Sequence, residues 1–260
     1  MTAVTKVSLP PVFLGAPLAH RALHDVTDGR PENSRAAIRA AMARGYGLEI
    51  DLQLSRDGLA MVFHDDDLDR LTGESGPVAA RDAQTLARIR LRGVDEGVPS
   101  FAEVLDLVAA RAPLLVELKD QHGALGPTDG RLEQAVAQDL QGYEGPLALM
   151  SFNPSMMVEM ARLAPDWPRG IVTCAYTARD WPTLSEPTRA HLQTIPDYVR
   201  AGAVFVSHDV HDLHSPHLRK VQDQGAVVFT WTVRSTAQEK EARKVAQNIT
   251  FEGYLADIPA

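Results

Sequence analysis

Two short apolar segments carry charged residues at a spacing of two. Glu49 and Asp51 lie in the run LEIDLQL, and Glu117 and Lys119 lie in the run LLVELK. Side chains two apart in a strand point to the same face, so each charged pair shares one face and aliphatic side chains take the other. Three carboxylates that face one cavity repel each other unless they are protonated or share a cation. Glu49, Asp51 and Glu117 are therefore predicted to be metal ligands.

The type of donor indicates which metal to expect. Carboxylate oxygens suit a hard divalent cation, so we expect Mg²⁺ or Ca²⁺. The sequence has no cysteine pair or His-x-His pair that would favour zinc. The alternative is that Glu49 and Asp51 form salt bridges with Arg21 and Lys119 inside a packed core. Spacing alone leaves this alternative open.

Two histidines follow apolar runs of the same kind. His20 precedes Arg21 near the N-terminus, and His64 ends the run LAMVFH. A single histidine is as often a core residue as a catalyst, but two beside three acids favour chemistry. A pair of imidazoles can act as general base and general acid at a phosphoryl group, while Arg21, Lys119 and the metal offset charge on its oxygens. Asp65 is placed to orient His64.

These residues must be brought together by the fold. Short apolar runs alternate with segments of helical period, which is typical of parallel βα units. The length of 260 residues fits one (β/α)8 TIM barrel, and the carboxyl ends of barrel strands meet at one face. We therefore predict a single α/β domain, residues 1–260, with strands near Val12–His20, Gly47–Leu54, Pro113–Lys119, Leu147–Phe152, Arg169–Tyr176, Ala203–His208, Ala226–Val233 and Thr250–Asp257.

The segment after the second strand departs from a simple βα unit. Asp57-Gly58 between two strand-like runs predicts a hairpin, which would return His64 toward Asp51. The polar residues 65–99 are too long for a loop and are expected to form a small insertion over the barrel mouth, with a helix near Asp82–Arg90. The other expected helices are Asn33–Arg44, Ser100–Arg111, Asp129–Leu140, Asn153–Leu163 and Ser235–Ala246, with less distinct ones at Ile195–Arg200 and Leu213–Gln222.

Composition and charge exclude several kinds of partner. A formal charge of −8 disfavours nucleic acid and anionic lipid surfaces as extended partners, while a small anionic substrate can still bind at a local positive site. Cys174 is the only cysteine, and we expect it to be buried. No long apolar run predicts a membrane span or a secretory signal, so we expect a cytoplasmic protein without stable membrane insertion. The oligomeric state is not predicted.

Several longer motifs resemble one family. The runs AHRALHDVTDGRPENS, LEIDLQLSRDGLAMVFHDDDLDRLTGESGPV, LLVELK, SFNP, FTWTV and GYLADIP occur in this order between residues 19 and 259. Together they are similar to the glycerophosphodiester phosphodiesterase family. Such a series covers nearly the whole chain.

The resemblance implies a TIM barrel. It also implies metal-dependent hydrolysis of glycerophosphodiesters to sn-glycerol 3-phosphate and an alcohol such as choline or ethanolamine. Such a reaction belongs to lipid and glycerol metabolism. The resemblance implies that the substrate's neighbouring hydroxyl attacks phosphorus. Carried over motif by motif, it implies that His20 and His64 are the acid/base pair, that Arg21 and Lys119 contact phosphate, and that Glu49, Asp51 and Glu117 bind the metal.

Two features depart from the family pattern. Ala22 stands where the family usually has glycine, and the segment Leu23–Pro31 separates it from Glu32-Asn33-Ser34, which resembles the family's Glu-Asn-Thr. This loop is expected to overhang the site, so the sequence does not decide the alcohol moiety.

Trp231 and Phe152 end later strands, where they could line the substrate pocket or belong to the core. The tract from His208 to His217 has the spacing of a metal site, but a solvated loop fits it better, and only His208 is placed to reach the pocket. A retaining glycosidase would need two acids about 5 Å apart across the scissile bond, and the strand that ends at Trp231 offers no acid. A non-catalytic binding barrel is the other alternative.

Overall fold

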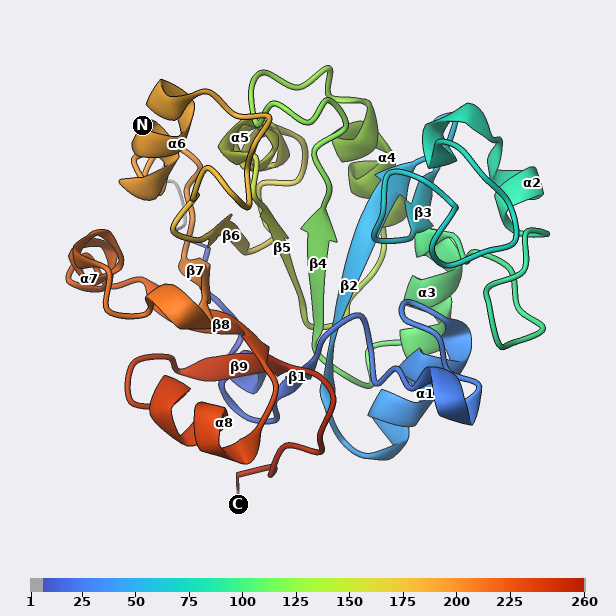
Figure 1. The fold of residues 1–260 in the computed structure, drawn as a ribbon, viewed down its shortest axis with the longest axis horizontal. Helices are drawn as coiled ribbons and strands as arrows, with labels where there is room; N and C mark the ends of the chain where they lie inside the picture. The colour runs from blue at the N-terminus through green and yellow to red at the C-terminus, as the bar shows by residue number, and fades with distance from the viewer. Residues whose placement is uncertain (1–6, 260) are drawn as a thin grey trace.

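Eight parallel strands close into a barrel in the computed structural model, which describes residues 7–259. Residues 1–6 and 260 of the expected domain lie outside this range. The strand order is β1-β9-β8-β7-β6-β5-β4-β2, and β1 also pairs with β2, which closes the ring (Figure 1). The predicted TIM barrel is confirmed. Its strands are β1 (Leu18–Ala19), β2 (Gly47–Leu54), β4 (Leu114–Leu118), β5 (Leu147–Ser151), β6 (Arg169–Thr173), β7 (Phe205–Asp209), β8 (Val227–Val233) and β9 (Asn248–Phe251).

Helices surround this barrel (Figure 1). Most of them begin at polar caps: the Ser34 hydroxyl accepts from the Ala37 N–H, and Ser100 and Glu103 form a capping box. No helix within residues 7–259 combines the length and the apolar character that a membrane crossing requires. The helices are α1 (Arg35–Ala43), α2 (Ala83–Leu86), α3 (Phe101–Val108), α4 (Arg131–Asp139), α5 (Pro154–Leu163), α6 (Glu186–Gln193), α7 (Pro216–Gln222) and α8 (Thr236–Ala242).

The strands separate two apolar layers. Leu48, Ile50 and Leu52 of β2 pack with the helices in the outer layer. Large side chains such as Phe205 and Phe229 fill the lower barrel interior. Because side chains alternate along β2, Glu49 and Asp51 must point into the barrel, as predicted.

The first and last strands were predicted wrongly in part. Within the expected strand Val12–His20, residues Pro11–Leu14 form a 3₁₀ helix, and Phe13 fills the bottom of the barrel against Phe229. Prolines 10, 11 and 17 lack the N–H that a strand ladder needs, which confines β1 to two residues. β9 begins at Asn248, two residues before the predicted start, and the chain turns at Gly253, whose φ is +77°.

Two further boundaries also differ. The helix predicted at Ile195–Arg200 is a series of turns, and α6 occupies Glu186–Gln193 instead. That helix was missed because only Leu192 is buried, so it has no apolar period. β6 ends at Thr173 rather than at Tyr176, where φ is +44°.

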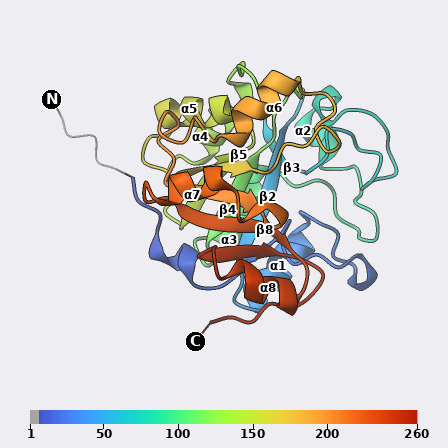
Figure 2. The ribbon, with the colours of Figure 1, turned by 60° about the vertical axis from the view of Figure 1, so that its left-hand side comes forward.

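The hairpin and insertion after β2 are confirmed. β3 (Ala60–Val62) pairs antiparallel with β2, with Leu52 opposite Val62. Residues 65–99 pack around a small separate apolar core, in which Leu68 and Leu86 of the insertion meet Phe63 at the end of the hairpin. The expected helix Asp82–Arg90 is shortened to α2 (Ala83–Leu86), beside a 3₁₀ turn, η3 (Val78–Ala80). Figure 2 shows the insertion as a set of loops that project beside β3.

Candidate active site

The charged strand residues meet in one cavity at the carboxyl end of the barrel. The cavity measures about 150 Å³. It lies above the aromatic side chains that fill the lower barrel. Its polar walls come from β1, β2, β4 and the segments that follow them, while β5, β7 and β8 contribute mainly apolar and hydroxyl groups. The lining includes His20, Arg21, Glu49, His64, Glu117, Lys119, Phe152, Ser207, Trp231 and Arg234.

Glu49, Asp51 and Glu117 form a compact group of carboxylates. One oxygen from each lies within 4.8 Å of the others, and all three side chains are buried. Register explains the contact, because Asp51 lies directly opposite Glu117 in the β2–β4 pairing. The Lys119 ammonium lies 2.7 Å from Asp51 Oδ1 and 2.9 Å from Glu117 Oε1.

Burial and charge act differently on the two acids of β2. Burial raises the pKa of Glu49 well above its usual value, and the neighbouring charges of Asp51 and Glu117 raise it further. Burial would also raise the pKa of Asp51, but the positive charges of Lys119, His64 and Arg21 outweigh it and lower that pKa strongly. Of these two acids, Asp51 therefore keeps its negative charge more readily, and a bound cation would favour the charged form of Glu49.

The carboxylate group fits a divalent cation. Oxygens 4.8 Å apart or closer can all bind one ion at the 2.3–2.6 Å distances that are common for Ca²⁺, and small shifts would suit the shorter Mg²⁺ distances. Asp51 Oδ1 is buried and lies 2.7 Å from the Lys119 ammonium, and a carboxylate oxygen with one such partner keeps a second lone pair for a cation. The salt-bridge alternative is also partly present, because Lys119 contacts two of the three acids.

The chain between β1 and α1 brings Arg21 to these acids. Arg21 and Ala22 both adopt positive φ, at 51° and 62°. This turn directs the Arg21 N–H to Glu49 Oε2 at 2.8 Å. The Arg21 guanidinium donates to Glu32 at 2.7 Å and lies 3.9 Å from Asp51. The left-handed conformation explains why glycine is usual at position 22, since alanine adopts it at a cost of about 1–2 kcal/mol.

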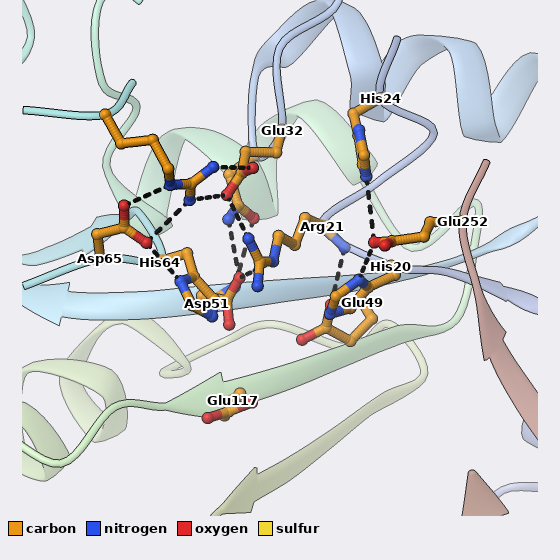
Figure 3. A network of polar contacts seen from close by, with 12 residues as sticks. His20, Arg21, His24, Glu32, Glu49, Asp51, His64, Asp65, Glu117 and Glu252 are labelled. Atoms are coloured by element: carbon orange, nitrogen blue, oxygen red, sulfur yellow. Dashed lines mark hydrogen bonds and ion pairs between the residues drawn. The ribbon is translucent and has the colours of Figure 1, made fainter. Parts of the chain in front are cut away.

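His20 belongs to a chain of ionic contacts that runs from the cavity to the surface. Its Nδ1 lies 2.5 Å from Glu252 Oε2, and its side chain is 13% exposed. Figure 3 shows His24 on the same side of Glu252, 3.5 Å away. Arg234 donates to the other Glu252 oxygen at 2.8 Å. Burial lowers the pKa of His20, although the hydrogen bond with Glu252 opposes this shift. When Nδ1 donates to Glu252, the neutral ring carries its free lone pair on Nε2.

His64 has a matching carboxylate partner. Its Nδ1 lies 2.7 Å from Asp65 Oδ1, and Asp65 in turn accepts two hydrogen bonds from Arg70 at 2.7 and 2.8 Å. Arg70 also donates twice to Glu32, which contacts Arg21 (Figure 3). The insertion and the loop after β1 are therefore joined across the site by ion pairs.

The two predicted aromatic residues lie side by side on the opposite wall. Phe152 and Trp231 meet edge to face, with ring centroids 5.4 Å apart. Both are partly exposed and line the cavity, so neither is a fully buried core residue. The Trp231 indole N–H donates to the Ser207 carbonyl at 3.1 Å, which fixes the ring.

Sequence reasoning missed several members of this site. Glu252 precedes the GYLADIP run, and Asn33 was expected at the start of a helix and in the Glu-Asn-Ser motif, without a contact of its own. Ser34 caps α1, and Asn33 donates to Asp51 Oδ2 at 2.9 Å. Arg70 had no signal in the sequence. His208 was predicted wrongly: it points out of the barrel and contacts Thr173 and Asp212.

Comparisons with known proteins agree on the family. The model of the glycerophosphoryl diester phosphodiesterase family matches residues 20–250. A glycerophosphodiester phosphodiesterase of Bacillus subtilis is 24% identical over 207 residues, which cover 73% of this chain and 67% of that protein.

Among solved structures, an Oleispira antarctica phosphodiesterase in complex with the product sn-glycerol-3-phosphate superposes with a TM-score of 0.71 at 22% identity. The match covers 92% of this chain and 93% of that one. A glycerophosphodiester phosphodiesterase from Thermotoga maritima gives a TM-score of 0.68 at 18% identity, over 91% and 94% of the two chains.

Proposed function

This chain belongs to the glycerophosphoryl diester phosphodiesterase family and is a phosphoric diester hydrolase, and we propose that it uses a divalent cation and two histidines to release sn-glycerol 3-phosphate from glycerophosphodiesters. The observation that carries the proposal is a single cavity lined by Glu49 and Glu117, two histidines, two arginines and a lysine, with Asp51 grouped beside the two acids. The product bound to the Oleispira antarctica protein supports the same substrate class here.

We assign Glu49, Asp51 and Glu117 as the ligands of the cation, Mg²⁺ or Ca²⁺. When bound, such an ion withdraws charge from the phosphoryl oxygens and makes phosphorus a better electrophile. Lys119, which already contacts two of these acids, would turn toward a phosphate oxygen. Arg21 is held by Glu32 at the edge of the same cavity, where its guanidinium can take a second oxygen.

The two histidines differ in a way that suggests their roles. His20 is the more buried of the two, and its lowered pKa favours the neutral base. His64 also lines the wider cavity outside, where a departing alcohol would leave. We therefore assign His20 as the base that takes the proton of the attacking hydroxyl, and His64 as the acid that protonates the leaving oxygen.

The attacking group is proposed to be the substrate's own hydroxyl next to the phosphoester. Its oxygen forms a bond to phosphorus as the bond to the alcohol breaks, which gives a cyclic phosphodiester. Water then opens the ring, with the proton transfers reversed between His64 and His20. Phe152 and Trp231 are proposed to cover the glycerol carbons during these steps. A substrate without that hydroxyl should be cleaved far more slowly, and equal rates would exclude the cyclic route.

The direct test is release of glycerol 3-phosphate from glycerophosphocholine, measured with added Mg²⁺ or Ca²⁺ and with EDTA. We expect activity that EDTA abolishes and that falls by about 10²–10⁴-fold in His64→Ala. His122→Ala is the matched control, because His122 is half exposed and lines neither cavity of the site. Turnover that survives EDTA, or no turnover with any divalent ion, would contradict the proposal.

We also propose that residues 1–260 form one domain, since the insertion 65–99 is joined to the barrel by the Arg70 ion pairs. A cytoplasmic location stays a prediction, with which the single buried Cys174 is compatible.

A further inference from the structure

The catalytic cavity opens into a second, larger one. This outer cavity measures about 570 Å³ and shares His64, Glu117, Lys119 and Phe152 with the inner one. The inner cavity, at about 150 Å³, has room for little more than the phosphate and its glycerol. If the proposed function holds, the alcohol on the far side of phosphorus must therefore lie in the outer cavity, next to His64.

The outer cavity carries uncompensated negative charge. Four of its lining carboxylates, those of Asp66, Asp67, Asp69 and Asp120, form no ion pair with any residue in the described range 7–259.

Its two cations are already neutralised. Arg70 forms ion pairs with Glu32 and Asp65, and Lys119 with Asp51 and Glu117. The part of the cavity beyond the phosphate position therefore favours a positive charge.

Asp120 is the acid of this cavity that other groups hold in place. The Asn153 amide donates to Asp120 Oδ1 at 2.8 Å, and the Leu125 N–H donates to Oδ2 at 3.0 Å. Asn153 is fully buried at the N-cap of α5. It also donates to the Gly126 carbonyl at 2.8 Å, so it ties down the loop that carries Asp120.

An aromatic pair completes the opposite wall. Phe152 and Trp181 both line the outer cavity, with ring centroids 5.1 Å apart, and both are partly exposed. The Trp181 ring is fixed by its indole N–H, which points to Cys174 Sγ at 3.3 Å, and by Tyr176 at 5.3 Å. Aromatic faces attract cations, and they suit a quaternary ammonium that cannot donate hydrogen bonds.

We propose that the outer cavity is the leaving-group subsite and that it selects a cationic amino alcohol, with the ammonium held between the Phe152–Trp181 wall and the carboxylates of Asp67 and Asp120. A neutral polyol head group would lose the charge interaction, and an anionic one would be repelled. The proposal depends on the proposed function, since the ligand is the alcohol part of the same substrate.

The test compares three diesters with the same glycerol phosphate. Glycerophosphocholine carries the cation, its 3,3-dimethylbutyl analogue has the same shape with carbon in place of nitrogen, and glycerophosphoglycerol is a neutral polyol. We expect kcat/KM for the choline diester to exceed each of the others by about tenfold, the combined effect of a cation–π contact and partly exposed ion pairs. Equal kcat/KM for the choline and dimethylbutyl diesters would overturn the proposal and leave the proposed function standing. No hydrolysis of any of the three would contradict the proposed function itself.

Variants test which carboxylates recognise the positive charge of the head group. We expect Asp120→Asn and Asp67→Asn each to lower the choline to dimethylbutyl ratio by about two- to threefold. Asp120→Asn can disturb the loop that Asp120 holds. Asp67 makes no side-chain hydrogen bond within the described chain, so Asp67→Asn removes a charge and leaves those loop contacts intact. Asp106→Asn, on the exposed face of α3 and outside both cavities, should keep the wild-type ratio. A ratio measured on one preparation does not depend on its folded fraction. An unchanged ratio in both cavity variants would refute the assignment.

Discussion

Glu252→Gln is expected to weaken the contact that orients His20 while it keeps the histidine itself. In the wild type, a carboxylate oxygen lies 2.5 Å from His20 Nδ1, and Arg234 holds the other oxygen at 2.8 Å. Glutamine has nearly the same shape but lacks the charge, and its amide nitrogen cannot accept the Nδ1 proton. The substitution leaves Glu49, Asp51 and Glu117 in place, because Glu252 contacts none of these three acids in the structure.

The size of the effect follows from the bond that is lost. Hydrogen bonds to a charged partner contribute about 1.5–3 kcal/mol, which corresponds to a fall of about 10- to 100-fold in kcat/KM if the bond matters fully in the transition state. The pH profile should move as well. Glu252 raises the pKa of His20 against the effect of burial, so its loss lowers that pKa further. Under the proposed assignment of His20 as the base, the acid limb of kcat/KM against pH should shift to lower pH.

The assay is glycerol 3-phosphate release across pH 4–9 at saturating divalent ion, with thermal unfolding measured in parallel. Glu144→Gln, an exposed glutamate outside the site, is the control and should keep the wild-type profile. A Glu252→Gln enzyme with unchanged kcat/KM and an unchanged acid limb would refute the role of this contact. A shift of the acid limb to higher pH would show that His20 is not the base.

Three further outcomes are expected. Glu117→Gln should weaken Mg²⁺ or Ca²⁺ binding in calorimetry by about 10-fold or more, because a neutral amide oxygen replaces a charged ligand; equal affinity would exclude it as a ligand. Gly170→Ala should lower the free energy of unfolding by about 1–3 kcal/mol, because its Cβ would lie 2.2 Å from the Phe205 ring, whereas Gly73→Ala meets nothing within 4 Å and should not. Burial raises the pKa of Asp139 to about 6, so its charge destabilises the fold as pH rises from about 4 to above 6. Asp139→Asn should therefore raise the free energy of unfolding at pH 8 by about 1 kcal/mol, a value discounted for partial exposure, and should leave it unchanged at pH 4. Chemical denaturation at the two pH values checks this.

Strand periodicity was sufficient to predict the centre of the site. Glu49 and Asp51 point into the barrel because their strand is covered outside by helices, so alternation alone assigns their direction. The Asp57-Gly58 turn in the same way predicted the hairpin that returns the chain toward His64. These signals are local, since each depends on residues within one strand or one turn.

The first strand and α6 show where local signals fail. An apolar run suggested a strand from Val12, but three prolines and the need to fill the barrel bottom with Phe13 decided otherwise. α6 has almost no apolar face to detect, because most of its surface stays in solvent. In both cases the outcome depends on what the segment packs against.

By itself, the sequence determined the barrel, the three acids and the two histidines, because each follows from a pattern confined to one segment. Asp65 was also predicted as the partner of His64, but only the tertiary structure decided the partner of His20 and the ion pairs behind Asp65. Glu252 is 232 residues from His20, and Arg70 reaches Glu32 across 38 residues, so no spacing rule connects them. The same holds for the acidic and aromatic walls of the outer cavity, since Asp67, Asp120 and Trp181 come from three separate loops. Ionic partners and cavity walls depend on how distant segments pack, and that information does not lie in any single stretch of the chain.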